Sequence, residues 1–343
     1  MIRFDSDYTE GCHPRVLDAL VRTNMEQTPG YGLDGHCERA RALIRSACAA
    51  PEADVHFLVG GTQTNATVIA AALRPWQGVL SPDTGHINCH ETGAIEAGGH
   101  KVLTLPHDNG KITAEQLRRA IDALRADGNY EHIVQPGMVY ISQPTEYGTL
   151  YTKAELEAIS AVCRERDLPL MLDGARLAYA LAADGTLTLA DYARCCDVFT
   201  VGGTKCGLLF GEAVVITRQD LKPDFRNLIK QRGGMLAKGR LLGVQFETMF
   251  EDGLYLECGR RGVDEARRIR GALLARGLDL AFDSPTNQIF VLLTPAQRDQ
   301  LQRDFAVGCW DTTGGERDAY RLCTSWATKP EAVDELLTAI AKL

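Results

Sequence analysis

Short apolar runs alternate with helix-like segments through the first two thirds of the chain. The runs that read as strands lie at 55–59, 78–80, 101–105, 138–142, 168–172, 198–201 and 212–216. Capping boxes open helices between some of them, as at Thr113 and Thr152, each followed three residues later by a side chain that can bond back. Strands that alternate with helices predict a mostly parallel sheet covered on both faces, so the fold class is α/β.

The ends of these strands are where a ligand is expected. In a parallel sheet, ligands gather beyond the carboxyl ends of the strands. Turns leave such ends at Gly61, His86, Gln143, Asp173 and Lys205. We therefore expect these turns to converge on one crevice.

Two of the turns carry ionisable side chains in a fixed order. Asp173 ends the apolar run 168–172, and Lys205 follows the run 198–201 after two glycines and Thr204. A lysine taken out of water loses its proton more readily, and a neutral amine can form a Schiff base with an aldehyde. An aspartate can keep a pyridine nitrogen protonated, so the ordered pair suits pyridoxal phosphate chemistry. Either residue alone fits equally well as a turn lysine or a capping aspartate.

A candidate anion site follows the strand at 55–59. Gly60, Gly61 and Thr62 turn directly into a helix that begins near Ala66. Bare backbone N–H groups, a hydroxyl donor and the positive end of the helix dipole would point at one place there. Such turns also occur without a ligand, so the motif gains weight mainly from the phosphate of the suspected cofactor.

Two further side chains are ambiguous from spacing alone. His86 reads first as a surface loop histidine. Arg321 lies inside an apolar strand at 320–326, where a guanidinium needs an anionic partner. That partner is equally well a structural carboxylate or the carboxylate of a ligand.

The pattern changes after about residue 221. A helical stretch at 241–274 precedes predicted strands at 278–282, 288–293 and 320–326 and a closing helix at 330–343. This arrangement predicts a small α+β domain. At 343 residues the chain suits two packed parts, which we expect at 1–240 and 241–343.

Charge and cysteine usage exclude several classes of protein. The net charge of −8 disfavours nucleic acid or an anionic membrane surface as a partner, and no apolar run approaches a membrane span. The first residues lack the basic and apolar regions of a signal peptide. The eleven cysteines show no C-x-x-C spacing, and the eight histidines form no H-E-x-x-H pattern. We expect a cytoplasmic protein with reduced thiols and no metal site.

One ordered set of motifs carries a family resemblance. Its members are Phe4-Asp5-Ser6-Asp7, Tyr31-Gly32-Leu33-Asp34, Gly60-Gly61-Thr62-Gln63-Thr64-Asn65, Gly85-His86-Ile87 with Glu91, Asp173-Gly174-Ala175-Arg176-Leu177, Thr204-Lys205 and Arg321-Leu322. The run that begins at Asp173 is the most specific. The set resembles the low-specificity L-threonine aldolase family of fold-type-I, β-eliminating lyase-like pyridoxal phosphate enzymes, over nearly the whole chain. The resemblance implies an aspartate aminotransferase-like large domain and a small C-terminal domain.

The resemblance also implies a cofactor site. Lys205 would hold pyridoxal 5'-phosphate as a Schiff base, and Asp173 would bind the pyridine nitrogen. His86 would stack on the ring, as both a catalytic and a cofactor-binding residue. The remaining expected cofactor-binding residues are Gly60, Gly61, Thr62, Arg176 and Thr204.

A substrate site follows from the same resemblance. Arg321, with Arg176 and Ser6 near it, would hold the carboxylate of an amino acid substrate. The resemblance implies a homodimer or homotetramer with shared active sites. Tyr31 would therefore line the site of its own chain or that of a neighbouring subunit. The implied reaction is cleavage of L-threonine, L-allo-threonine or related β-hydroxy-α-amino acids to glycine and an aldehyde. The alternative is another pyridoxal phosphate reaction on an amino acid, β-elimination or transamination.

The sequence departs from the family pattern at three places. His90 stands where many relatives have tyrosine, 143–147 replaces a segment that usually carries asparagine and histidine, and 202–204 replaces a serine-rich run. These changes leave the cofactor chemistry intact and bear on substrate preference and on the catalytic base. His86 is the candidate base, directly or through water, followed by His90.

Overall fold

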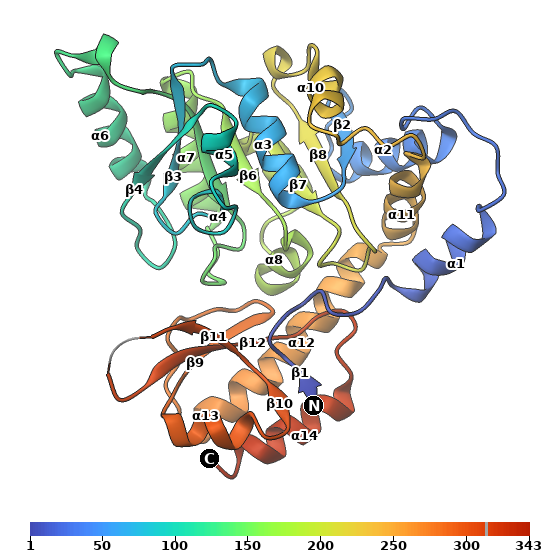
Figure 1. Cartoon of the computed structure of the whole chain (residues 1–343), viewed down its shortest axis with the longest axis vertical. Coiled ribbons are helices and arrows are strands. Elements are labelled where there is room, and N and C mark those ends of the chain that lie inside the picture. The colour runs from blue at the N-terminus through green and yellow to red at the C-terminus, as the bar shows by residue number, and fades with distance from the viewer. Residues whose placement is uncertain (313–314) are drawn as a thin grey trace.

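A seven-stranded sheet forms the centre of the larger part of the molecule, in a computed structural model that describes residues 1–312 and 315–343. Its strands lie in the order β2 (Asp54–Leu58), β8 (Glu212–Ile216), β7 (Val198–Gly202), β6 (Leu170–Asp173), β5 (Gln135–Ser142), β3 (Gln77–Pro82) and β4 (Lys101–Leu105) (Figure 1). Neighbouring strands are parallel except at β8, which runs antiparallel to both β2 and β7. The predicted mostly parallel sheet is confirmed.

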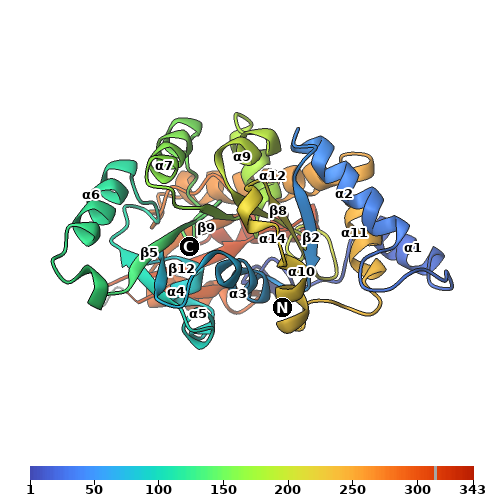
Figure 2. The ribbon, with the colours of Figure 1, turned by 90° about the horizontal axis from the view of Figure 1, so that it is seen from above.

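Helices cover both faces of this sheet, as Figure 2 shows from above. One face carries α2 (Gly35–Ala47), α6 (Ala114–Arg125), α7 (Lys153–Glu165) and α9 (Leu189–Cys195). The other carries α3 (Gly61–Ala72), α4 (His86–Cys89), α5 (Ala94–Ala97) and α10 (Phe225–Gln231). Two short 3₁₀ turns lie at Tyr130–His132 and Gln219–Leu221.

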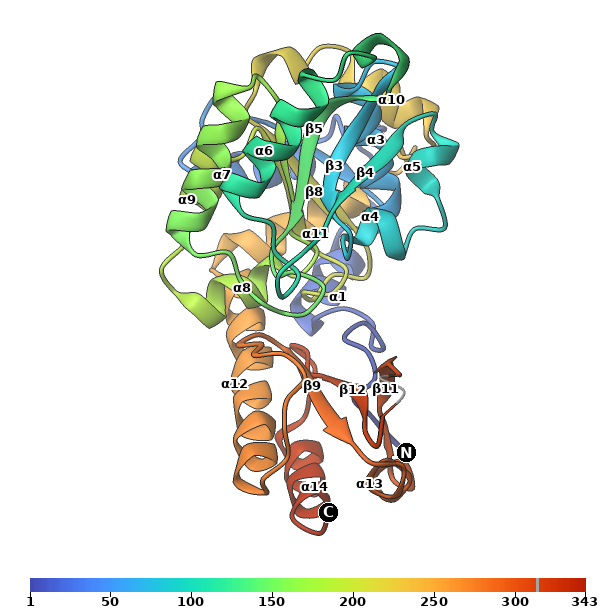
Figure 3. The same cartoon turned by 90° about the vertical axis from the view of Figure 1, so that its left-hand side faces the viewer.

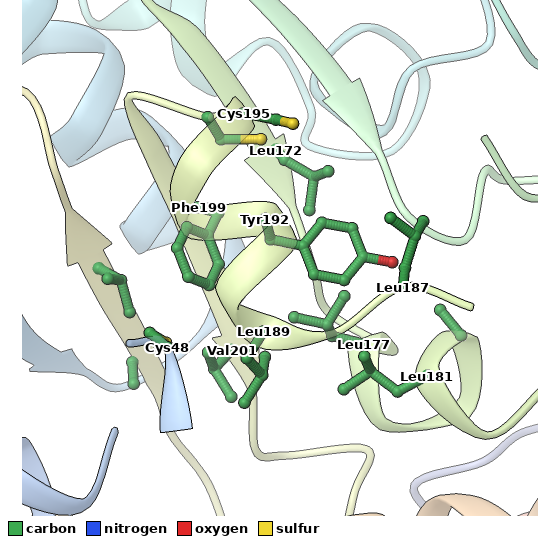
Figure 4. Packing of buried hydrophobic residues seen from close by; sticks show 14 of the residues in the cluster. Cys48, Leu172, Leu177, Leu181, Leu187, Leu189, Tyr192, Cys195, Phe199 and Val201 are labelled. Carbon is green, nitrogen blue, oxygen red and sulfur yellow. The ribbon is translucent and has the colours of Figure 1, made fainter. Parts of the chain in front are cut away.

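The strands that carry the candidate site are buried on both faces. On β6, Leu170 and Leu172 pack into one apolar cluster while Met171 packs into the other, because successive side chains point to opposite faces. Figure 4 shows the cluster that holds Leu172, where the ring of Tyr192 on α9 lies among Leu172, Leu177 and Leu187. This packing fixes the strand ends from which Asp173 and Lys205 emerge.

A smaller part of the molecule is built from the C-terminal third of the chain. Its three-stranded antiparallel sheet has the order β11 (Gly308–Asp311), β12 (Asp318–Cys323) and β9 (Gln288–Leu293). The helices beside it are α12 (Leu254–Ala275), α13 (Pro295–Leu301) and α14 (Pro330–Ile340). Figure 3 shows α12 running from the larger part, where it packs against α8 (Leu177–Asp184), into the smaller part.

The N-terminal segment joins the two parts. The strand β1 (Ile2–Arg3) pairs in parallel with β10 (Phe305–Ala306), and the Cys323 N–H donates to the Phe4 carbonyl. The chain then enters the larger part through α1 (Pro14–Arg22), which packs against α11 (Arg240–Glu251). Because α11 lies beside α2 and α12 spans both parts, the predicted division at residue 240 stays a prediction.

Some predicted elements differ from the structure. The strand expected at 278–282 contributes only an isolated bridge between Leu280 and Val291. The long helical stretch at 241–274 is broken at Gly253, whose φ of 72° lies in the left-handed region that glycine tolerates best. Within the described residues, no helix combines the length and the apolar character needed to cross a lipid bilayer.

Candidate active site

A cavity of about 220 Å³ opens at the carboxyl ends of the parallel strands. It is lined by Val59, Gly60, Gly61, Thr62, His86, Ser142, Pro144, Glu146, Asp173, Ala175, Arg176, Thr204, Lys205, Phe210 and Glu212. The expected convergence of the strand-end turns is therefore observed, with one exception. Gln143 turns away and bonds to Tyr151 and Tyr192, leaving its neighbours Ser142 and Pro144 in the wall.

Asp173 lies at the floor of this cavity and is held on both carboxylate oxygens. The Ala175 N–H donates to one oxygen at 3.0 Å, while the Asn65 amide and the Tyr140 hydroxyl donate to the other at 2.9 and 2.8 Å. Burial alone would raise the pKa of Asp173. The positive charge of His86 and these donors outweigh burial and lower the pKa. An ionised, fixed carboxylate of this kind can hold a proton on a ring nitrogen.

His86 is tied to the same network through Glu91. The Nδ1–H of His86 donates to the buried Glu91 carboxylate at 2.8 Å, and Asn65 donates to the same oxygen at 2.7 Å. Burial would lower the pKa of His86, but the bond to Glu91 and the nearby Glu146 and Asp173 carboxylates raise it overall. Because Nδ1 is occupied by Glu91, Nε2 is the nitrogen left to face a ligand.

The turn that carries Lys205 requires glycine at positions 202 and 203. A Cβ on Gly202 would stand 2.3 Å from the Ala175 carbonyl oxygen, and one on Gly203 would stand 2.6 Å from that of Gly211. The Tyr179 hydroxyl donates to the Lys205 carbonyl at 2.7 Å, and the Tyr255 hydroxyl donates to the Gly202 carbonyl at 3.0 Å. The turn is therefore fixed, while the Lys205 amine lies 5.9 Å from the ring of the exposed Tyr8.

The glycine turn before α3 fits a phosphate group. Gly60 is the N-cap of α3 and supplies no side chain to cap it, so the first backbone N–H groups of the helix are free to bind an anion. A Cβ built on Gly60 or Gly61 meets no atom within 4 Å, so the space beside the turn is open. Thr62 adds a hydroxyl on the cavity side, and the residues present thus suit a phosphorylated ring compound.

Arg176 reaches the cavity wall but is already paired. Its guanidinium donates from Nε and a terminal nitrogen to the two Asp7 oxygens, at 2.6 and 3.0 Å. The Asn287 amide donates to Asp7 as well, at 2.9 Å. Burial opposes the charge on Asp7, but Arg176 outweighs it and lowers the pKa of Asp7 to about 2. The pair links the N-terminal segment, the larger part and the smaller part.

The Asp7→Asn variant should be strongly destabilised, because it leaves the buried Arg176 without a counter-ion. The expected cost is roughly 3–5 kcal/mol in the free energy of unfolding. Because the folded pKa of about 2 lies below the ordinary value, the stabilisation is full above about pH 4 and is lost as pH falls toward 2. Chemical denaturation from pH 2 to 7 measures it, with Asp252→Asn, in the exposed pair with Arg15, as the control. Equal losses in both variants would contradict the expectation.

Arg321 and Ser6 lie in a neighbouring polar cluster with unfilled bonds. Arg321 on β12 donates to the Gln288 side chain and to the Asp5 carbonyl, each at 3.2 Å, and lies 5.1 Å from the Trp310 ring. Among the described residues it pairs with no carboxylate. The buried atoms Arg321 Nε, Ser6 Oγ and Gln288 Nε2 have no hydrogen-bond partner, so together they offer an incomplete site for an anion.

Tyr31 lies away from this cavity within the chain. It is 46% exposed, has a φ of 61°, and borders a separate small cavity with Arg226 and Met235. The Lys230 amine stands 5.1 Å from its ring. One copy of the chain therefore does not bring Tyr31 to Lys205.

Several buried groups of the site were not predicted as site residues, among them Asp7, Asn65, Glu91 and Glu212. Asp7 and Asn65 stand inside motifs that were recognised, but their bonds to Arg176 and Asp173 depend on the folded chain. Glu212 is the first residue of an apolar strand, and this position is the one feature of the sequence that could have marked it as a site residue. Burial raises its pKa to about 8. Among the described residues, no cluster of histidine, cysteine or acidic side chains suits a metal ion.

Comparison with known proteins places these features in a family. The family model described as beta-eliminating lyase matches residues 4–294. A solved structure of Leishmania major threonine aldolase is 46% identical, with a TM-score of 0.97 over 100% of this chain and 99% of that chain. The low specificity L-threonine aldolase of Pseudomonas aeruginosa is 33% identical over 97% of this chain and 95% of its own length.

A more distant structure bears on the fold alone. A Thermus thermophilus aspartate aminotransferase mutant, 17% identical, has a TM-score of 0.71 over 99% of this chain and 96% of that chain. The predicted aminotransferase-like fold is thereby confirmed. The family match covers most of the sequence, including the turns that carry Asp173 and Lys205. This chain belongs to the beta-eliminating lyase family.

Proposed function

We propose that this protein is a pyridoxal 5'-phosphate-dependent lyase of the L-threonine aldolase type, which cleaves β-hydroxy-α-amino acids to glycine and an aldehyde. The observation that carries the proposal is the pairing of an ionised Asp173 with Lys205 across one cavity that also holds an open glycine turn for a phosphate. The threonine aldolase names of the two similar proteins support the choice of reaction.

The cofactor would be held by residues from three strand ends. Lys205 would bond to its aldehyde, Asp173 would keep a proton on its ring nitrogen, and the turn at Gly60, Gly61 and Thr62 would bind its phosphate. When bound, pyridoxal phosphate supplies a protonated ring that draws electrons from the bonds to the Cα of the amino acid. His86 would stack on that ring, held in place by Glu91. Thr204 and Arg176 would complete the wall.

The chain's own acid–base groups account for the bond that breaks. Loss of an aldehyde requires the substrate's β-hydroxyl proton to be removed. His86 would take it at Nε2, because Nδ1–H is committed to Glu91. Only the neutral form of His86 can take this proton, and because the pKa of His86 is raised, that form becomes abundant at a higher pH than for an ordinary histidine. Arg321 would hold the carboxylate and thereby orient the Cα–Cβ bond.

Product identification tests the function directly. The purified protein would be incubated with pyridoxal phosphate and L-threonine, and in parallel with L-phenylserine, and the products identified by mass spectrometry. Glycine with acetaldehyde or benzaldehyde is the expected result. A 2-oxo acid with ammonia would show β-elimination instead and overturn the aldolase assignment while keeping the cofactor.

The Arg321→Ala variant tests the substrate carboxylate site. Loss of a charged hydrogen-bonding partner should raise the KM for L-threonine roughly 10- to 100-fold, because such bonds contribute about 1.5–3 kcal/mol. Arg303→Ala, which changes an exposed arginine of the same part of the chain, is the control. Steady-state kinetics measure both. An unchanged KM in Arg321→Ala would place the carboxylate elsewhere.

The protein should also act as a homodimer or homotetramer with an amino acid as its small-molecule substrate. Support comes from the exposed, strained position of Tyr31, which the family resemblance assigns to an active site. Large apolar side chains nearby in the sequence are also exposed, namely Leu17, Val21, Met25 and Leu33. Exposed apolar patches of this kind mark interfaces between subunits.

A further inference from the structure

A second carboxyl group shares the cavity with Lys205. Glu212 is the first residue of β8 and lies opposite Gly202 of β7. Gly202 itself comes three residues before Lys205 in the chain. It lines the same cavity but is only 5% exposed. The proposed function uses Asp173, His86 and Lys205 and leaves this acid without a role.

The surroundings of Glu212 offer few partners for a negative charge. Its carboxyl group accepts the Gly203 N–H at 3.3 Å and a hydrogen bond from the Thr204 side chain, and no described residue forms an ion pair with it. The titratable groups that face it are Lys205 and Cys206 from the turn after β7, Asp173 from the end of β6, and Tyr255 from α12. Lys205 is the only cation of that set.

These surroundings decide the protonation state of the acid. Burial raises the pKa of Glu212, the Lys205 charge opposes the rise, and the Asp173 charge adds to it, giving a value of about 8. At neutral pH the group is therefore mainly a neutral acid. The carboxyl lines the same cavity as the Lys205 amine, so its proton is held within the site rather than in bulk water.

We propose that the Glu212 carboxyl holds the proton that the Lys205 amine takes up when it is released from its bond to the cofactor, and that Glu212 receives this proton back when the bond re-forms. The proposal rests on the proposed pyridoxal phosphate site. It makes Glu212 the acid–base partner of Lys205, distinct from the base that acts on the β-hydroxyl.

The proton transfer balances within the pair. Release leaves a neutral amine in the same cavity as a neutral acid. An amine is a much stronger base than a carboxylate, so the O–H bond of Glu212 breaks and an N–H bond forms on Nζ of Lys205. The products are an ammonium and a carboxylate, and the net charge of the pair is zero before and after. The reverse transfer restores the nucleophilic amine and the neutral acid.

Infrared spectroscopy of the pyridoxal phosphate-loaded protein, in which Lys205 is bonded to the cofactor, tests the storage of the proton. Wild-type protein titrated from pH 5 to 10 should show a protonated-carboxyl band at pH 7 that disappears as the pH rises, because the pKa of Glu212 is raised by burial. The Glu212→Gln variant should lack this band. Gln keeps an acceptor for the Gly203 N–H, so the backbone contact survives. If the Glu212→Gln variant does not fold, the Glu212→Asp variant assigns the band instead, because it should shift the frequency of the carboxyl band.

Stopped-flow absorbance tests the transfer itself. Glycine added to the pyridoxal phosphate-loaded protein displaces Lys205, and the change in the cofactor spectrum gives the rate. Glu212→Gln should slow this step roughly 100-fold, the contribution expected of a general acid, and Glu212→Asp should recover part of the rate. Glu257→Gln, which alters an exposed acid on α12, should leave it unchanged.

The outcomes separate this proposal from the function. A carboxyl band absent at pH 7, or a displacement rate unchanged in Glu212→Gln, would overturn the role of Glu212 whatever the products of threonine are. If the band and the slowed displacement are found while threonine gives no glycine, Glu212 keeps its role and the aldolase assignment fails.

Discussion

Replacing Lys205 by alanine is expected to abolish threonine cleavage, with a loss in kcat of more than about 10⁴-fold, because the residue that bonds to the cofactor acts as a unit with the rest of the site. The turn that carries it is fixed by Gly202, Gly203 and two tyrosine hydroxyls, so the variant should fold normally. Initial rates of aldehyde formation measure the loss of turnover. The absorbance of bound pyridoxal phosphate measures the loss of the bond to residue 205.

The matched control for this change is Lys101→Ala, which removes an exposed lysine on the edge strand β4. It should retain wild-type rates and the wild-type cofactor spectrum. The scheme would be refuted by a Lys205→Ala protein that melts like the wild type and still turns over threonine at a comparable rate.

Asp173→Asn is expected to have the second largest effect. Asparagine keeps an oxygen for the Ala175 N–H but removes the charge that would hold a proton on the ring nitrogen. A loss in kcat on the order of 10³-fold is expected, comparable to the removal of a preorganised electrostatic group. Cofactor should still bind through Lys205, so absorbance spectra and steady-state kinetics together separate the two roles.

A half-buried acid, Asp197, provides the control for Asp173. Asp197 lies just before β7, at the opposite end of the strands, and accepts the Leu170 N–H at 2.8 Å. Asp197→Asn removes a comparable charge but does not touch the cavity. It should lower stability with little effect on kcat, and a loss equal to that of Asp173→Asn would indicate a general effect of buried charge.

The alternation of strands and helices was readable from the sequence because strands buried on both faces form near-continuous apolar runs. For the same reason, the sequence does not indicate whether such a strand runs parallel or antiparallel to its neighbours. β8 reads like its neighbours although it is antiparallel, since a fully buried strand has no polar face to orient it. The helix α8 went unrecognised for a related reason: 177–184 is apolar nearly all round and lacks the helical spacing of polar residues.

The strand-end residues of the candidate site were predictable, but their partners were not. Asp173, Lys205 and His86 follow strands, so the sheet itself places them. The Asp7–Arg176 pair joins residues that are 169 positions apart, and no local pattern encodes such a contact. Glu212 shows why burial matters: a glutamate at the start of a strand looks ordinary until the fold removes it from water.

The N-terminal segment has a consequence for how the chain is made. Ile2 pairs with Phe305, and Phe4 bonds to Ala306 and Cys323, so the backbone of residues 2–4 pairs with segments about 300 residues later in the chain. During synthesis residues 2–4 stay without these partners until residues 305–323 have left the ribosome. Joining ends so far apart costs little more than joining nearer ones, because the entropy of loop closure grows only logarithmically with length. Completion of the polar cluster beside Arg321 is therefore a late event in the making of the chain, and a chain that stops before β12 would lack it.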